Sequence, residues 1–309
     1  MTPKKISFVV PVFNESANIG PLYQELSAMM SKVKHTFEII FVDDGSTDNS
    51  VAVIRELSTK DNRIYYIELS RNFGQQYALK AGMDVANGDC VISMDCDLQH
   101  PSDVVLQLIG KWDEGYEVVY TKRLPDKTLP WLKRKTSDMF YKVLNILSDT
   151  KLESGVADFR LLNRNVVDAI RKLNESGLFL RGLVKWVGFK QARIDYHAND
   201  RHSGVSKYTF RKMVAFAMQG VFSFSTRPLF FVLYSGLAML AFSLALFAWI
   251  VFGYFVSGKP NWFAIVLDVI FFFFSTQLFM MGIMSIYMSR LIAESRNRPL
   301  YIVRNTNYI

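Results

Sequence analysis

Two long apolar runs near the C-terminus constrain this 309-residue chain more than any other feature. Residues 229–258 contain no charged side chain, and residues 269–289 contain none either. A bilayer core needs about 20 apolar residues in one helix, so each run is long enough to cross a membrane. We therefore expect two transmembrane helices, at about 229–257 and 261–289, joined as a hairpin through the turn signal Pro260-Asn261.

Basic residues around these runs predict the topology. Those that flank the two runs are Arg211, Lys212, Arg227, Arg290, Arg296 and Arg298. The connecting loop carries only Lys259, so the positive-inside rule places both flanks in the cytoplasm. The N-terminus has no long apolar core, which argues against a cleaved signal peptide. We expect a multi-pass protein of the inner (cytoplasmic) membrane, with its N-terminal domain and both termini in the cytoplasm.

The first 125 residues alternate between two patterns. Short runs rich in Val, Ile and Phe, typical of strands, lie at 6–12, 37–42, 64–69, 90–94 and 117–121. Stretches with helical spacing lie at 19–33, 50–58, 77–86 and 104–112. Strands that alternate with helices predict an α/β fold with a mostly parallel sheet covered on both faces. No Gly-x-Gly-x-x-Gly follows the first strand, which argues against a dehydrogenase.

Charge is segregated along the chain. Residues 1–100 carry nine Lys and Arg against thirteen Asp and Glu, whereas residues 101–228 carry 22 against 13. The first region suits a metal or a polar ligand, and the second suits a surface that faces anions. Residues 131–147 and 207–228 have the pattern of basic amphipathic helices that lie in a membrane interface. For 131–147, packing against the sheet with solvated lysines is an equal alternative.

Acidic residues follow two of the predicted strands. Asp95 and Asp97 come directly after the fourth strand, and Gln99 continues the alternation. Two carboxylates together with phosphate oxygens form a typical Mg²⁺ or Mn²⁺ site, to which Gln99 would add a carbonyl oxygen. Asp43-Asp44-Gly45-Ser46 follows the second strand, where a turn and a helix cap explain the glycine and the serine. The second acid there would accept hydrogen bonds from a ribose or a base.

The cysteine and histidine residues do not indicate a disulfide framework or a metal site. Cys90 and Cys96 are too few for a disulfide framework or for a zinc site by themselves. The four histidines show no metal-ligand spacing, and we interpret them as structural or surface residues. They are His35, His100, His197 and His202. His202 is of most interest, because it neighbours Arg201. We expect Asp268, in the second apolar region, to lie near the far membrane interface or, alternatively, to face another subunit of an oligomer.

Several motifs together resemble a known family. Those in the first third are Val-Pro-Val-Phe-Asn-Glu at 10–15, Asp-Asp-Gly-Ser-Thr-Asp at 43–48, Arg-Asn-Phe-Gly-Gln at 71–75 and Asp-Cys-Asp-Leu-Gln at 95–99. They resemble the inverting glycosyltransferases of family 2 with the GT-A fold. Asp-Phe-Arg-Leu-Leu at 158–162 and Arg-His-Ser-Gly-Val-Ser-Lys at 201–207, followed by two spans, resemble the polyprenyl-phosphate glycosyltransferases. These include bactoprenol glucosyltransferases and, more distantly, dolichol-phosphate mannose synthases.

The resemblance implies roles for individual residues. It assigns the nucleotide sugar to Pro11, Phe13, Glu15, Val42, Asp44, Asp95, Cys96 and Arg123. It assigns a Mg²⁺ or Mn²⁺ ion to Asp95, Asp97 and Gln99, and the acceptor phosphate to Arg123, Arg134, Arg201 and Lys207. The residues that it implies as catalytic are Asp158, Arg201 and Lys207. Phe13 stands where relatives often have tyrosine, which removes a hydroxyl group and keeps a stacking face.

Asp158 matches the acid that is usually assigned as the catalytic base. A lipid phosphate has its second pKa near 6, so at pH 7 it is already mostly a dianion. Such a nucleophile has no proton to lose, and general-base catalysis has little to act on. Our hypothesis is that Asp158 positions a sugar hydroxyl or a basic side chain and supports the developing positive charge on the sugar.

The implied function is inverting transfer of a hexose, with UDP-glucose as first choice, to undecaprenyl phosphate at the cytoplasmic membrane face. The product would serve cell-surface glycan modification, such as that of the O-antigen of lipopolysaccharide. Other donors (GDP-mannose, UDP-GlcNAc, UDP-galactose, an amino-arabinose type) and a non-catalytic membrane adaptor that binds nucleotide sugars remain alternatives. A homotetramer is expected by resemblance, and nucleic acid is not an expected partner. A processive polysaccharide synthase lacks support, because the chain has no Gln-x-x-Arg-Trp motif.

The chain therefore divides into four predicted parts. Residues 1–206 form a cytoplasmic GT-A domain, and residues 207–228 form a juxtamembrane amphipathic helix. Residues 229–289 hold the two transmembrane helices, and residues 290–309 form a cytoplasmic tail. The hairpin is interpreted mainly as an anchor, because its two spans contain little polar chemistry.

Overall fold

The computed structural model describes residues 3–124, 156–173, 178–199 and 262–308, together with residue 175 and isolated positions between 234 and 252. The amphipathic segments at 131–147 and 207–228 lie outside the described residues, as does nearly all of the first predicted span. Arg134, Arg201 and Lys207 lie outside them too, so the roles assigned to these three side chains stay predictions.

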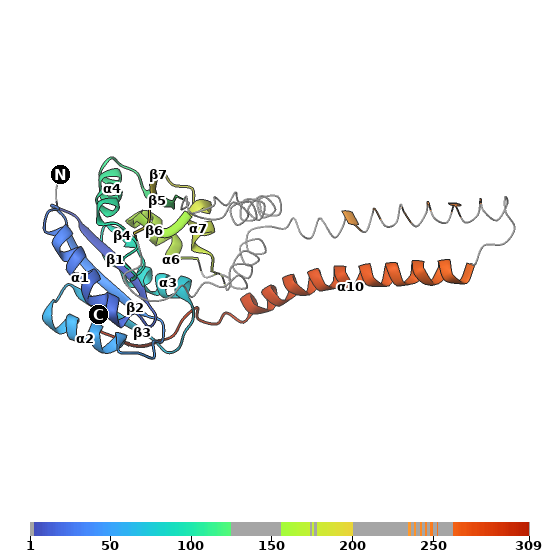
Figure 1. Ribbon diagram of the computed structural model, residues 1–309, viewed down its shortest axis with the longest axis horizontal. Coiled ribbons are helices and arrows are strands. Elements are labelled where there is room, and N and C mark those ends of the chain that lie inside the picture. The colour runs from blue at the N-terminus through green and yellow to red at the C-terminus, as the bar shows by residue number, and fades with distance from the viewer. Residues whose placement is uncertain are drawn as a thin grey trace.

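The described part of the chain forms one mixed sheet of eight strands, in the order β7-β5-β6-β4-β1-β2-β3-β8 (Figure 1). The strands are β1 (Lys5–Val12), β2 (Thr36–Asp43), β3 (Ile64–Leu69), β4 (Cys90–Ser93), β5 (Val118–Arg123), β6 (Val156–Asn163), β7 (Gln191–Tyr196) and β8 (Val303–Thr306). Pairing is parallel between β1 and β2, β1 and β4, β2 and β3, and β5 and β7. It is antiparallel where β6 meets β4 and β5, and where β8 meets β3.

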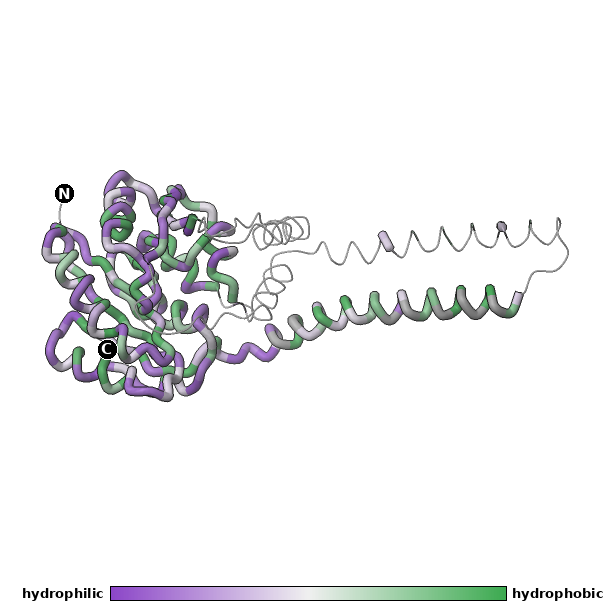
Figure 2. Tube along the Cα trace, in the orientation of Figure 1, coloured by the Kyte–Doolittle hydropathy of each residue, from purple (hydrophilic) through white to green (hydrophobic). Residues whose placement is uncertain are grey.

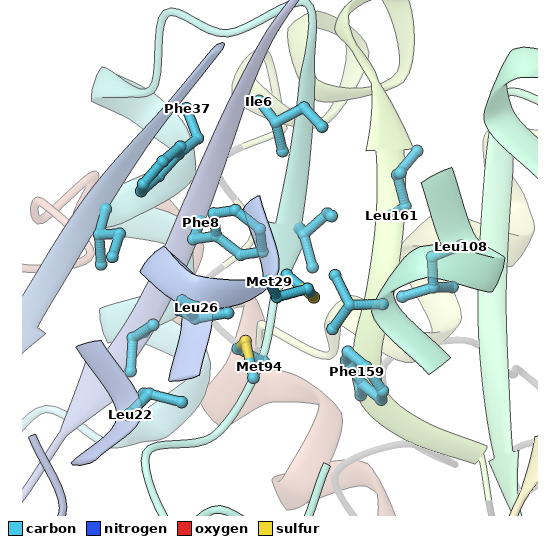
Figure 3. Close-up of a cluster of buried hydrophobic side chains, with 14 of the residues drawn as sticks. Ile6, Phe8, Leu22, Leu26, Met29, Phe37, Met94, Leu108, Phe159 and Leu161 are labelled. Atoms are coloured by element: carbon cyan, nitrogen blue, oxygen red, sulfur yellow. The ribbon is translucent and has the colours of Figure 1, made fainter. Parts of the chain in front are cut away.

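Helices cover both faces of this sheet. They are α1 (Ser16–Met30), α2 (Ser50–Lys60), α3 (Gln75–Val85), α4 (Ser102–Asp113), α6 (Arg164–Arg171) and α7 (Leu180–Trp186). Successive residues of a strand point to opposite faces, so β1 sends Phe8 into one buried cluster and Val9 into another. Figure 3 shows the first cluster, where Leu26 of α1 and Leu108 of α4 pack around the strand residues. The predicted α/β architecture is confirmed.

All five predicted strands and all four predicted helices are present, with ends shifted by up to three residues. The sequence patterns do not predict β6, β7 and β8. The most consequential of these is β6, which enters antiparallel between β4 and β5. Its register pairs Ser93, the last residue of β4, with Arg160, so Asp158 lies on β6 close to the end of β4. The Ser93 hydroxyl donates a hydrogen bond to the Asp158 carbonyl oxygen at 2.6 Å, which fixes this alignment.

The C-terminal tail returns to the sheet and adds β8 to its edge beside β3 (Figure 1). Two tyrosine hydroxyls of the tail donate hydrogen bonds to acidic residues of the sheet domain. Tyr301 donates to the Asp84 carboxylate of α3 at 2.9 Å, and Tyr308 donates to the buried Glu38 of β2 at 3.2 Å. Residues 301–308 of the predicted tail thus belong to the sheet domain, whereas residues 290–295 are the end of a long helix that starts at Trp262.

The helix α10 (Trp262–Ser295) extends away from the sheet domain (Figure 1). Its segment Phe272–Ser289 is long and apolar enough to cross a membrane, and none of that segment is buried against other described residues. Figure 2 shows the apolar residues along it. Among the described residues this is the one segment of such length and composition, so the two-helix hairpin stays a prediction.

Candidate active site

The loops that follow β1, β2, β3 and β4 meet at one edge of the sheet, because these strands run in parallel. Asn14 joins two of them: its backbone N–H donates to Ser46 Oγ at 2.9 Å, and its side-chain Oδ1 accepts from the Thr47 N–H at 2.8 Å. Asn14 has a positive φ of 55°, a conformation that asparagine tolerates better than most residues. Pro11, Phe13 and Glu15, assigned to the nucleotide, all lie at this end of β1.

The acid pair after β2 is built into the same edge. Asp44 accepts hydrogen bonds from the backbone N–H groups of Phe73 (2.7 Å) and Gly74 (2.9 Å), so it ties the β2 loop to the β3 loop. Asp43 Oδ2 accepts from the N–H groups of Gly45 and Ser46, each at 3.1 Å. Its Oδ1 is buried and has no hydrogen-bond partner among the described residues. Burial raises the pKa of both carboxyls. The ribose role of Asp44 and the base-contact role of Val42 stay predictions.

Gly45 lets the β2 and β3 loops approach each other. It has a φ of +74°, and a Cβ atom there would lie 2.6 Å from the carbonyl carbon of Arg71. Both the left-handed backbone and the backbone contact exclude a side chain at this position. The close approach is what allows Asp44 to reach the amides of Phe73 and Gly74.

Replacing Gly45 with alanine should lower the free energy of unfolding by about 3 kcal/mol or more, because strain and a backbone clash add. Gly115 is a matched control, since its φ is +89° but a Cβ atom there would meet nothing within 4 Å. Gly115→Ala should cost only about 1 kcal/mol. Denaturant unfolding of the two variants measures the difference. Equal losses in both would show that the loop contact at Gly45 carries no energy of its own.

The loop after β4 carries the two aspartates of the predicted metal site. Asp95 Oδ1 accepts from Gln75 Nε2 at 2.6 Å, and its side chain is 41% exposed. Asp97 is mostly buried, and its Oδ1 accepts from the Gln99 N–H at 3.2 Å. The Gln99 Oε1 accepts from Arg123 Nη1 at 3.4 Å, so the guanidinium group of Arg123 belongs to the same edge. Leu98 turns the loop with a φ of 60°.

Cys96 lies between the two aspartates but faces the hydrophobic core. Burial and the acids around it raise the pKa of its thiol, so the side chain is neutral at pH 7. Any contact between Cys96 and a bound sugar nucleotide must therefore use its backbone. The assignment of Cys96 to the nucleotide-sugar site stays a prediction.

The donor atoms at this loop suit a hard divalent cation. Asp95, Asp97 and Gln99 offer oxygen atoms, the ligands that Mg²⁺ and Mn²⁺ prefer. Within the described ranges, no group of three or more His, Cys, Asp or Glu side chains is placed to enclose a metal ion by itself. A cation held here would need further ligands from outside the protein, and diphosphate oxygens are of the right type.

Asp158 of β6 is the centre of a buried ion-pair cluster. Its Oδ1 accepts from Arg160 Nη2 at 2.8 Å and from Arg181 Nε at 3.1 Å. Its Oδ2 accepts from Arg181 Nη2 at 2.9 Å and from Gln76 Nε2 at 3.0 Å. Burial opposes ionisation of Asp158, but the charges of Arg181 and Arg160 outweigh it and hold the pKa at about 2. A carboxylate with such a pKa is a weak base at pH 7.

Several residues of this edge were missed by the sequence analysis. Gln75 and Gln76 at the start of α3 hold Asp95 and Asp158, and Arg181 reaches Asp158 from α7. His100, which the sequence predicts to be a structural or surface residue, is buried beside Asp95. Gln75 is the last residue of the motif at 71–75, and His100 directly follows the motif at 95–99. Their positions in the sequence could therefore have indicated that they lie at the site. Arg181 lies in none of the quoted motifs, so nothing in the sequence indicated that it belongs to the site.

The open sheet with acids at its carboxyl edge is an α/β fold of the kind that the motifs predict. Mannosyl-3-phosphoglycerate synthase from Rubrobacter xylanophilus has a similar fold, with a TM-score of 0.51 and 16% identity over 70% of this chain and 71% of that one. The sequence profile described as "Glycosyl transferase family 2" matches residues 7–171. The chain belongs to glycosyl transferase family 2.

Curated relatives extend this similarity over nearly the whole chain. The bactoprenol glucosyl transferase of Shigella phage SfV is 39% identical over 302 residues, which cover 97% of this chain and 98% of the relative. The uncharacterized glycosyltransferase YkcC of Bacillus subtilis (strain 168) is 38% identical and covers 97% of this chain and 93% of its own length. The family resemblance predicted from the motifs is confirmed.

Proposed function

We propose that this protein transfers glucose from UDP-glucose to the phosphate of a polyprenyl phosphate at the cytoplasmic face of the membrane, with inversion at the sugar. The observation that carries the proposal is the near full-length similarity to bactoprenol glucosyl transferase. Because the match covers 97% of this chain, it includes the apolar segment of α10 as well as the sheet domain.

Asp95, Asp97 and Gln99 would hold a Mg²⁺ or Mn²⁺ ion at the carboxyl edge of β4. When bound, such an ion neutralises the negative charge that accumulates on the leaving diphosphate. Arg123 contacts Gln99 and adds a positive charge beside the same position. The loops after β1, β2 and β3 would hold the nucleotide, with Pro11, Phe13, Glu15, Val42 and Asp44 as the predicted contacts.

The acceptor phosphate is the nucleophile in the proposed reaction. One of its oxygens forms a bond to the anomeric carbon from the face opposite the leaving group, the bond from that carbon to the diphosphate breaks, and UDP departs with the electron pair. No proton has to leave a phosphate dianion first. The pKa of Asp158 at about 2 supports the hypothesis that this residue positions a basic side chain, and Arg181 is that side chain.

Two anions must approach each other during this reaction, so cations are needed along the path of the acceptor. Arg160 and Arg181 pair with Asp158, and Arg123 supplies charge beside Gln99. We assign the remaining phosphate contacts to Arg134, Arg201 and Lys207, as the motifs predict. The apolar helix α10 and the first predicted span would anchor the enzyme where its lipid acceptor resides. A homotetramer and a role in O-antigen modification also belong to this proposal.

A donor screen tests the proposal. The full-length protein in detergent is mixed with undecaprenyl phosphate, Mg²⁺ or Mn²⁺, and each of UDP-glucose, UDP-galactose, UDP-GlcNAc and GDP-mannose. We expect nucleotide release with UDP-glucose, matched by an organic-soluble sugar product, and loss of both after chelation. Nucleotide release without a lipid product would point to another acceptor, preference for a different donor would correct the sugar, and binding without turnover would favour the adaptor alternative.

A further inference from the structure

The His100 ring contacts two aromatic side chains at the proposed donor site. Its ring stacks on Phe159 of β6, with centroids 4.3 Å apart and planes inclined by 27°. Its Nδ1 lies 3.2 Å from the hydroxyl oxygen of Tyr196 at the end of β7. The side chain is only 6% exposed. The ring therefore has one orientation, fixed by two strands that neighbour the site.

The second nitrogen of this ring faces Asp95. His100 Nε2 is buried, has no hydrogen-bond partner among the described residues, and lies 3.5 Å from Asp95 Oδ2. An unprotonated Nε2 would direct its lone pair at the negative Asp95 carboxylate, which is unfavourable. The favoured tautomer of the ring therefore carries its proton on Nε2, and its Nδ1 accepts a hydrogen bond from the Tyr196 hydroxyl. Burial raises the pKa of Tyr196 to about 12, so its hydroxyl keeps the proton that it donates.

Asp95 thus has a hydrogen-bond donor on one side and the buried Nε2 of His100 on the other, from different elements. Gln75 Nε2, at the start of α3, donates to Oδ1 at 2.6 Å, and the N–H of His100 faces Oδ2 from the other side. The carboxylate still has an exposed side and unused lone pairs on each oxygen. A carboxylate whose rotation is fixed in this way meets a ligand without losing further side-chain freedom.

We propose that His100 is a positioning residue of the donor site: opposite the Gln75 amide, it fixes the rotation of the Asp95 carboxylate and thereby raises the affinity for the divalent cation that accompanies the sugar nucleotide. The inference rests on the proposed function, because the cation at Asp95 is part of that proposal. Partners that orient metal-binding carboxylates typically change metal affinity by 10- to 100-fold when removed.

Two substitutions separate hydrogen bonding from ring packing. His100→Phe keeps a ring against Phe159 and removes the N–H group, whereas His100→Gln removes the ring and keeps an N–H donor of similar reach. The full-length protein in detergent is titrated with Mn²⁺ at saturating UDP, and free Mn²⁺ is followed by its electron paramagnetic resonance signal. We expect His100→Phe to weaken Mn²⁺ binding at least tenfold and His100→Gln to stay within about threefold of the wild type.

His35 provides a matched control. It is also a buried histidine beside a carboxylate, with its Nε2 3.2 Å from Asp113, but it precedes β2 at the opposite edge of the sheet. His35→Phe should leave Mn²⁺ binding unchanged even if it lowers the melting temperature. Tyr196→Phe is a second probe, because it removes the hydrogen bond that selects the tautomer of His100. It should weaken Mn²⁺ binding severalfold, and it decides the question if His100→Phe does not fold.

The inference is overturned if His100→Phe binds Mn²⁺ as the wild type does, or if His100→Gln loses as much affinity as His100→Phe. Unchanged binding by a folded Tyr196→Phe variant would likewise count against it. If the wild-type protein binds no Mn²⁺ at saturating UDP, the proposed metal site fails together with this inference. Wild-type Mn²⁺ binding that is indifferent to His100 leaves the proposed function intact and removes only the role of His100.

Discussion

Replacing both Asp95 and Asp97 with asparagine should lower the turnover of sugar transfer by about 10³-fold and leave the fold intact. Asparagine keeps the size and one acceptor oxygen of each side chain but removes two negative charges. Loss of a single electrostatic contact to the reacting groups already costs about 10²–10³ in turnover. Initial rates at saturating UDP-glucose and acceptor, measured over a range of Mn²⁺ concentrations, test the prediction.

Asp89→Asn is the matched control for this double substitution. Asp89 directly precedes β4, its carboxylate accepts from the Lys5 N–H at 2.8 Å, and it lies at the opposite edge of the sheet. The same chemical change there should leave turnover within about twofold of the wild type. If the Asp95/Asp97 double variant kept more than a tenth of wild-type activity, or if the wild-type protein were fully active after chelation, the metal site would have to be abandoned.

The second large effect is expected at Asp158. Asp158→Asn should lower turnover by about 10²–10³-fold and also lower the free energy of unfolding by about 3–5 kcal/mol, because it leaves the buried Arg160 without its counter-charge. The loss of turnover should be the same at every pH between 6 and 9. A lost general base would instead be partly replaced by hydroxide, so a rate that recovers at high pH in the variant alone would contradict the positioning role.

Arg181→Ala separates the loss of turnover from the loss of stability that we expect for Asp158→Asn. Asp158 keeps its hydrogen bonds with Arg160 and Gln76 in this variant, so the fold should survive while turnover falls about 10²-fold. Combining Arg181→Ala with Asp158→Asn should cost little more than Asp158→Asn by itself, because residues that act as one unit are not additive. Arg63→Ala, which removes an arginine bound to Asp61 just before β3, should leave turnover unchanged.

Asp158 also predicts the sign of a pH effect on stability. Its pKa in the folded protein, about 2, is below the ordinary value of 3.8, so the unfolded chain binds the proton more readily. The stabilisation is therefore complete above about pH 4 and is lost as the pH falls toward 2. Unfolding of the wild type and of Asp158→Asn at pH 7 and pH 3 measures it. A stability difference between the two that does not shrink on acidification would contradict the assigned pKa.

The sequence by itself predicted the strands and helices of the first 125 residues, their mostly parallel arrangement and the acids that follow the strands. Apolar runs of strand length, separated by helical spacing, predict βα units, and the carboxyl ends of parallel strands share one edge. That reasoning places Asp44, Asp95 and Asp97 together from local patterns alone. It also recognises the apolar segment that forms α10, because length and lack of charge are local properties.

Only the tertiary structure decided what surrounds those acids. Asp158 is 63 residues from Asp95 in the chain, and it reaches the same edge of the sheet because β6 inserts antiparallel between β4 and β5. Arg181, Tyr196 and β8 likewise reach their partners through pairings between distant segments. Local patterns record how a segment folds and which face it buries, whereas the choice of a distant partner depends on the packing of the whole sheet and leaves no periodic trace in the sequence.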